Sequence, residues 1–120
     1  MSEPNIDLVI DCADLDRMAA FWSAALGYRI VGTKDQYTLL KPAEGAHPPL
    51  ILQRVPEGKT AKNRMHLDIR TLDVETKATE LEGLGARRID IGAAADAGWI
   101  TMADPEGNEF CVCPGVPTNL

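Results

Sequence analysis

The segment HLDIRTLDVETKATELEGLGA, residues 66–86, decides the fold of this chain. It opens with Leu67 and Ile69 alternating with polar residues, and this two-residue period is typical of a half-buried strand. Asp73 can then cap a helix. Apolar residues follow at helical spacing as far as Gly85, a residue that suits a helix end. The segment therefore predicts a strand followed directly by a helix.

The same order of patterns occurs earlier in the chain. IDLVIDC, residues 6–12, alternates like a strand, and Asp14 can cap a helix that ends near Gly27. The second copy of this first strand is expected over residues 64–70. Three short strand candidates follow each helix, at residues 28–32, 37–41 and 49–55 in the first copy and at 87–91, 98–102 and 108–114 in the second.

The chain is therefore predicted to be an α+β protein of two repeated βαβββ units, about residues 5–55 and 64–114. A unit of this size cannot cover both faces of its own sheet, so two units are expected to pair in one domain, residues 1–120.

The last strand candidate divides its residues between two faces. DPEGN, residues 104–108, is turn chemistry, because Asp opens a turn, Pro presets a backbone angle and Gly is permissive. The strand that follows places Glu109, Cys111 and Cys113 on one face, and the residues between them on the other. This polar, sulfur-bearing face is a candidate pocket lining.

Composition excludes several classes of function. The 120 residues carry a formal net charge of -6, which argues against a nucleic-acid partner. The sequence has no apolar run long enough to span a membrane. The acidic start does not resemble a secretory signal peptide, and the three cysteines fit reduced thiols in a cytoplasm, so a cytoplasmic location is expected.

Three stretches resemble the vicinal oxygen chelate superfamily, which contains glyoxalases, bleomycin-resistance proteins and extradiol dioxygenases. They are DLDRMAAFWSAALGY at residues 14–28, the segment at 66–86, and DPEGNEF at 104–110. The chain is most similar to small glyoxalase-like proteins with a KNRMHLD-type segment, here residues 62–68. The resemblance implies a curled mixed sheet that forms a cup around a ligand, and chains that pair as homodimers.

The resemblance also implies where a metal would be held. His66 matches one histidine position of the superfamily, whereas Asp7 stands at the other. Cys111 stands where relatives usually carry a glutamate, and a fourth position falls near Ile51 or Gln53. The predicted metal ligands are therefore His66, Asp7 and Cys111, with Gln53 as a further alternative, in a site that departs from the superfamily's pattern.

The residue types limit the chemistry of such a site. Aspartate, histidine and thiolate are all zinc ligands, so zinc is the most compatible divalent cofactor. A non-haem iron site normally needs two histidines, and the second histidine, His47, lies in a Pro-rich loop, so dioxygenase chemistry is not expected. His66 could instead hydrogen-bond within the cup or contact a ligand, and Cys111 could be a small buried apolar residue.

Three other features have two interpretations each. Glu109 could be a catalytic general base if burial raises its pKa, or it could lie in water at the rim. Trp99 could stack on a ligand or pack in the core. The basic cluster at residues 59–64 could be a solvated connector or a positive lip for an anionic ligand.

We therefore predict a protein that binds a small organic ligand in its cup, with a degenerate metal site. The predicted ligand-binding residues are Asp7, Gln53, His66, Asp68, Trp99, Glu109 and Cys111. One alternative is a metal-dependent lyase or isomerase that uses His66 with Asp7, Cys111 or Gln53. A second alternative is a dimeric interaction domain.

Overall fold

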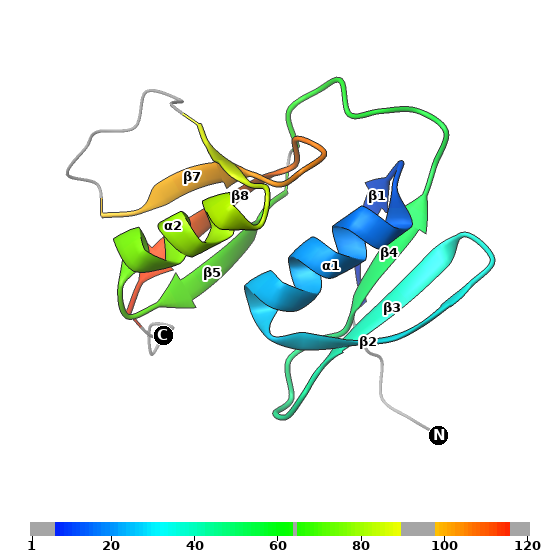
Figure 1. Cartoon of the computed structure of the whole chain (residues 1–120), viewed down its shortest axis with the longest axis horizontal. Coiled ribbons are helices and arrows are strands. Elements are labelled where there is room, and N and C mark those ends of the chain that lie inside the picture. The colour runs from blue at the N-terminus through cyan, green and yellow to red at the C-terminus, as the bar shows by residue number, and fades with distance from the viewer. Residues whose placement is uncertain (1–6, 64, 90–97, 116–120) are drawn as a thin grey trace. The chain divides into compact units, whose positions relative to one another are not determined.

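A computed structural model describes residues 7–63, 65–89 and 98–115 of the chain (Figure 1). The chain divides into two compact units, Met1–Gly58 and Lys59–Leu120, called here the first and the second unit. Among the described residues, no helix is both long and apolar enough to cross a membrane.

The first unit is one mixed sheet with one helix. Its elements are β1 (Leu8–Cys12), α1 (Leu15–Leu26), β2 (Tyr28–Lys34), β3 (Tyr37–Pro42) and β4 (Leu50–Arg54). The strand order is β1-β4-β3-β2, in which β1 and β4 run parallel and the other neighbours run antiparallel.

The second unit repeats this plan. Its elements are β5 (Leu67–Thr71), α2 (Val74–Gly83), β6 (Arg87–Arg88), β7 (Ile100–Ala103) and β8 (Glu109–Pro114). The strand order is β5-β8-β7-β6, again with one parallel pair, β5 and β8. The predicted fold of two βαβββ units, each with a four-stranded mixed sheet, is confirmed.

Both helices begin as their sequences predict. The Asp14 carboxylate accepts a hydrogen bond from the backbone N–H of Arg17 at 3.0 Å, and Asp73 accepts one from Thr76 at 3.1 Å. Each aspartate thus satisfies an N–H group that a helix start leaves without an intrahelical partner. After α1 the chain turns at Gly27, whose φ of 71° is left-handed and favours glycine.

Each helix covers its own sheet, but the two cores differ in size. Six of the twelve residues of α1 are buried, including Trp22 and Phe21, whose rings meet edge to face at 5.1 Å. In α2 only Ala78 and Leu81 are buried. The sheet side of the second core includes Phe110, which is 1% exposed. The first unit therefore holds more of the aromatic core.

In the second unit, β5 and β6 differ most from the ranges that the alternation predicts. β5 was expected over residues 64–70 but begins at Leu67, where its ladder with β8 starts, and Met65 is 81% exposed. β6 covers Arg87–Arg88 rather than residues 87–91, and residues 90 and 91 lie outside the described part of the chain. Alternation in sequence therefore extends beyond the pairing that defines the strand.

Candidate functional site

β8 forms the floor of the site, and it separates core from pocket as its sequence predicts. Phe110 and Val112 point into the core, where they are 1% and 0% exposed. The residues between them, Glu109, Cys111 and Cys113, are half-buried on the other face. This alternation follows from the pleat of the strand and needs no special backbone geometry.

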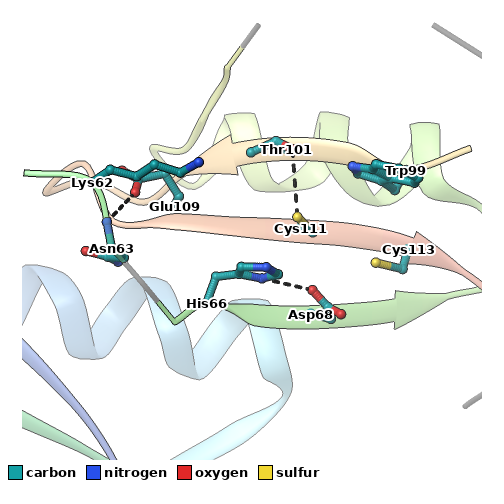
Figure 2. Close-up of a pocket in the computed structure, with 9 residues that line it drawn as sticks. All are labelled: Lys62, Asn63, His66, Asp68, Trp99, Thr101, Glu109, Cys111 and Cys113. Carbon is teal, nitrogen blue, oxygen red and sulfur yellow. Dashed lines mark hydrogen bonds and ion pairs between the residues drawn. The ribbon is translucent and has the colours of Figure 1, made fainter. Parts of the chain in front are cut away.

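A pocket of about 390 Å³ opens over this face of β8 (Figure 2). All of its lining residues belong to the second unit: Lys62, Asn63, His66, Asp68, Trp99, Thr101, Glu109, Cys111 and Cys113. They come from β5, β7 and β8, and from the segments that precede β5 and β7. The pocket is thus built on strands whose opposite faces are fixed by the core.

His66, Asp68 and Cys111 form a close group in the middle of the pocket. Their potential ligand atoms all lie within 4.8 Å of one another. The register of the sheet places Asp68 directly beside Cys111, and His66 Nδ1 lies 3.1 Å from Asp68 Oδ1. This contact orients the imidazole and leaves Nε2 as the nitrogen that could meet a ligand or metal.

Burial raises the pKa of both thiols that line the pocket. It raises the pKa of Cys111, where the Asp68 charge adds to the effect and a hydrogen bond with Thr101, at 3.7 Å between Sγ and Oγ1, opposes it. Burial also raises the pKa of Cys113, again with a contribution from Asp68. Because the thiolate is the nucleophile, neither cysteine is activated for nucleophilic chemistry in this environment.

Glu109 is held in its charged form at one end of the pocket. Its carboxylate lies 2.8 Å from Lys59 Nζ and accepts a hydrogen bond from the backbone N–H of Asn63, also at 2.8 Å. Burial alone would raise the pKa of Glu109. The contacts with Lys59 and Asn63 and the charge of Lys62 outweigh it, so the pKa lies below its ordinary value. This shift is the opposite of the one that a general base needs near neutral pH.

The pocket brings together five of the predicted ligand-binding residues, which are His66, Asp68, Trp99, Glu109 and Cys111. The two others, Asp7 and Gln53, belong to the first unit. Asp7 is exposed just before β1, and Gln53 is half-buried on β4. Their roles as ligands stay predictions, as does catalysis by Glu109.

Four lining residues were not in the predicted set: Lys62, Asn63, Thr101 and Cys113. Cys113 shares the alternating face of Glu109 and Cys111, so the sequence carried a signal for it. Lys62 lies in the basic cluster that was considered as a positive lip. Thr101 lies opposite Cys111 in the β7–β8 ladder, and this register could not be read from the sequence.

The central group fits a zinc ion by the chemistry of its donors. Imidazole, carboxylate and thiolate are all zinc ligands, and three protein ligands with an open fourth position are typical of catalytic zinc sites. Asp68 supplies the carboxylate of this group, and the role of Asp7 as a metal ligand stays a prediction. A thiolate donor favours zinc over harder cations such as manganese.

Comparison with known proteins gives a family and a fold. The family model described as a glyoxalase-like domain matches residues 7–113, nearly the whole chain. No curated protein matches the sequence. A glyoxalase/bleomycin resistance protein/dioxygenase family enzyme from Burkholderia phytofirmans PsJN is 16% identical with a TM-score of 0.69, covering 88% of this chain and 94% of that one.

Two fosfomycin resistance proteins, both FosX, have the same fold. The one from Mesorhizobium loti is 15% identical with a TM-score of 0.73, covering 97% of this chain and 94% of that one. A mutant from Listeria monocytogenes, complexed with Mn(II) and dihydroxypropylphosphonic acid, is 12% identical with a TM-score of 0.75, covering 97% and 93%. At these identities the likeness shows the fold alone. By its family match, the chain belongs to the glyoxalase-like family.

Proposed function

We propose that this glyoxalase-like protein binds a small organic ligand in the pocket of its second unit. The observation that carries the proposal is the pocket itself, whose volume of about 390 Å³ suits a small molecule. Small-molecule sites are typically concave, with apolar walls and a few convergent polar groups. Trp99 and the two protonated thiols supply weakly polar surface, while His66 and Asp68 supply polar groups.

The position of these residues supports binding rather than a purely structural role. Trp99 is 46% exposed, although a tryptophan in a core role would be expected to be buried. Side chains of His66 and Asp68 are 50% and 40% exposed, so their polar atoms are accessible. The aromatic and polar side chains of the pocket are therefore accessible to a ligand.

The test is to lower the volume of the pocket without changing its charge. Fragments found by ligand-observed NMR on the wild-type protein would be titrated by calorimetry into Cys113→Phe, which fills part of the pocket. Val31→Phe is the matched control, because Val31 is 45% exposed on β2 of the first unit. We expect binding to be lost in Cys113→Phe and kept in Val31→Phe. Unchanged binding in both variants would contradict the proposal.

A second candidate function is supported by the central group. In a metal-dependent lyase or isomerase, His66, Asp68 and Cys111 would hold zinc. The metal would supply Lewis-acid polarisation of a substrate oxygen. Binding would require the Cys111 thiol to lose its proton, since the thiolate is the ligand. His66, oriented by Asp68, would present Nε2 to the open side of the pocket.

Metal content separates the two candidates. The protein would be purified without chelator and its zinc measured by elemental mass spectrometry, together with His66→Ala and His47→Ala. These are the only two histidines of the chain, and His47 lies in the loop between β3 and β4 of the first unit. Stoichiometric zinc that is lost only in His66→Ala would support the enzyme. Metal-free protein that still binds fragments would support the binding module.

Assembly and location belong to the same proposal. The resemblance predicts a homodimer, and the reduced thiols and the acidic start of the sequence predict a cytoplasmic location. Sedimentation equilibrium over a range of concentrations would give the mass of the particle in solution. A dimer that persists on dilution is the expected result, and a monomer throughout would remove the dimeric interaction domain as an alternative.

A further inference from the structure

The pocket has two chemically different ends, set by the direction of β8. Glu109, Cys111 and Cys113 follow one another along the pocket floor, and four residues of strand span about 13 Å. Figure 2 shows Lys62 and Asn63 beside Glu109 at one end, and Trp99 beside Cys113 at the other. A ligand that fills the pocket lengthwise therefore meets both ends.

The Glu109 end has an excess of positive charge. Lys59 is engaged with Glu109 at 2.8 Å, and the backbone N–H of Asn63 donates to the same carboxylate. Lys62 lies beside Glu109 and also lines the pocket (Figure 2). Two lysines thus face one carboxylate, whose charge is already satisfied. The net charge of these three side chains is positive, so this end of the pocket favours an anionic group of the ligand.

The Cys113 end offers an aromatic surface. Trp99 is 46% exposed and lines the pocket, whereas Trp22, the other tryptophan of the chain, is 1% exposed in the first core. An accessible indole face stacks on planar aromatic rings, and this stacking adds to the gain from apolar burial. The neighbouring Cys113 is a small, weakly polar side chain that also lines this end, so it does not oppose an apolar ring.

The middle of the pocket disfavours a second anionic group. Asp68 carries its carboxylate there, next to Cys111, and His66 is its near partner at 3.1 Å. A dianion that spread its charge along the pocket would meet this carboxylate. The arrangement therefore suits one anionic group at one end only.

We propose that the ligand is an elongated organic anion, with a carboxylate-like group beside Lys62 and a planar aromatic ring stacked on Trp99. The proposal rests on the function proposed above, because it names the class of ligand for the same pocket. It also fixes an orientation. Arg70 lies opposite Cys113 in the β5–β8 ladder and does not line the pocket. Mutation of Arg70 would weaken binding only if the anionic group of the ligand lay at the Cys113 end.

The experiment compares matched probes. Naphthaleneacetate has a ring and a negative charge, naphthalenemethylammonium has a ring and a positive charge, and cyclohexaneacetate has the charge without the aromatic ring. Each would be titrated into isotope-labelled protein and followed by the indole N–H signals. The chain has two tryptophans, so Trp99 reports on the pocket and the buried Trp22 serves as internal control.

We expect naphthaleneacetate to bind most tightly and to shift the Trp99 signal. Lys62→Gln should weaken it by about 2- to 5-fold, as for an exposed ion pair. Trp99→Leu should weaken it by about 3- to 10-fold. Two control variants, Arg70→Gln and Lys77→Gln, the latter on α2, should leave its affinity unchanged. Naphthalenemethylammonium should bind Lys62→Gln at least as well as wild type.

Two results would overturn this inference while the proposed function stands. One is equal affinity for the two naphthalene probes, with no effect of Lys62→Gln. The other is a loss of affinity in Arg70→Gln instead of Lys62→Gln. If no probe binds but unrelated fragments still do, only the ligand class is wrong. If neither probes nor fragments bind, the proposed function fails as well.

Discussion

The two units share one topology but differ on the sheet face that carries the pocket in the second. In each sheet the last strand of the unit lies between the first strand and the third, so positions correspond through the ladders. In the first unit one such set of neighbours is aliphatic: Val9, Ile51 and Leu39. In the second unit the corresponding set is polar: Asp68, Cys111 and Thr101.

This difference shows that the fold requires apolar residues on one face of each sheet. The residue types on the other face can differ between the two units. The core face of the last strand is apolar in both units, with Leu50 and Leu52 on β4 and Phe110 and Val112 on β8. The opposite face of the second sheet carries carboxylates, a hydroxyl and two thiols, with the same topology. The site therefore depends on substitutions at positions that the core does not use.

The largest expected effect compares the two faces of β8. Phe110→Ala should lower the free energy of unfolding by about 3–5 kcal/mol, because it empties a fully buried position. Cys111→Ala should cost on the order of 1 kcal/mol or less, because Cys111 is only half-buried on the pocket face. Urea unfolding of both variants measures the difference. Equal losses would mean that the pocket face is part of the core after all.

The next prediction concerns a double variant. Two residues of the pocket face are replaced by the residues that stand at the corresponding positions of the first unit. Under the metal-dependent candidate function, Asp68→Val combined with Cys111→Ile should weaken zinc binding by more than about 100-fold, since even residues that only orient metal ligands contribute 10- to 100-fold. Competition with a chromogenic chelator measures the affinity. As a control, Val9→Ala with Ile51→Val changes the equivalent positions of the first unit and should leave zinc affinity as in wild type. Loss in the control variant would contradict the assignment of the site to the second unit.

The smallest effect concerns the charged end of the pocket. The folded pKa of Glu109 lies below its ordinary value of 4.5, so its stabilising contribution is present above that pH. The contribution is lost as pH falls from there through the lower folded pKa. At neutral pH, Glu109→Gln should therefore be less stable by about 0.2–1 kcal/mol, as for a pair near the surface.

Thermal unfolding between neutral and acidic pH tests this sign. The stability curves of wild type and Glu109→Gln should converge at the acidic end. Glu80→Gln removes a more exposed partner of Lys77 and should show a smaller difference throughout. A gap between wild type and Glu109→Gln that widens on acidification would contradict the account.

Much of the fold could be predicted from the sequence because its signals are local. The capping aspartates Asp14 and Asp73, and the alternation over Glu109–Pro114, specify helix starts and strand faces by short-range chemistry. The exposure of Met65 could not be predicted, because it depends on where the β5 ladder begins. Local sequence patterns do not show at which residue the pairing between two strands begins or ends.

Residues of the site could be predicted from the sequence only where they belong to a predicted strand with a clear alternating pattern. His66, Asp68 and Cys111 were all predicted to bind the ligand, but the sequence could not show that Asp68 is the carboxylate next to Cys111. The reason is the parallel register that sets Asp68 next to Cys111, a contact between residues far apart in the chain. The low pKa of Glu109 depends in the same way on Lys59, fifty residues earlier in the chain.

The central claim is that the second unit carries the binding pocket. The most direct test is an amide chemical-shift map of the wild-type protein with a fragment that binds it. The account predicts that the shifts cluster at the pocket residues of β5, β7 and β8, while the aliphatic face of the first unit, around Ile51, stays unchanged. Shifts concentrated at Val9, Leu39 and Ile51, with none at Cys111, would contradict it.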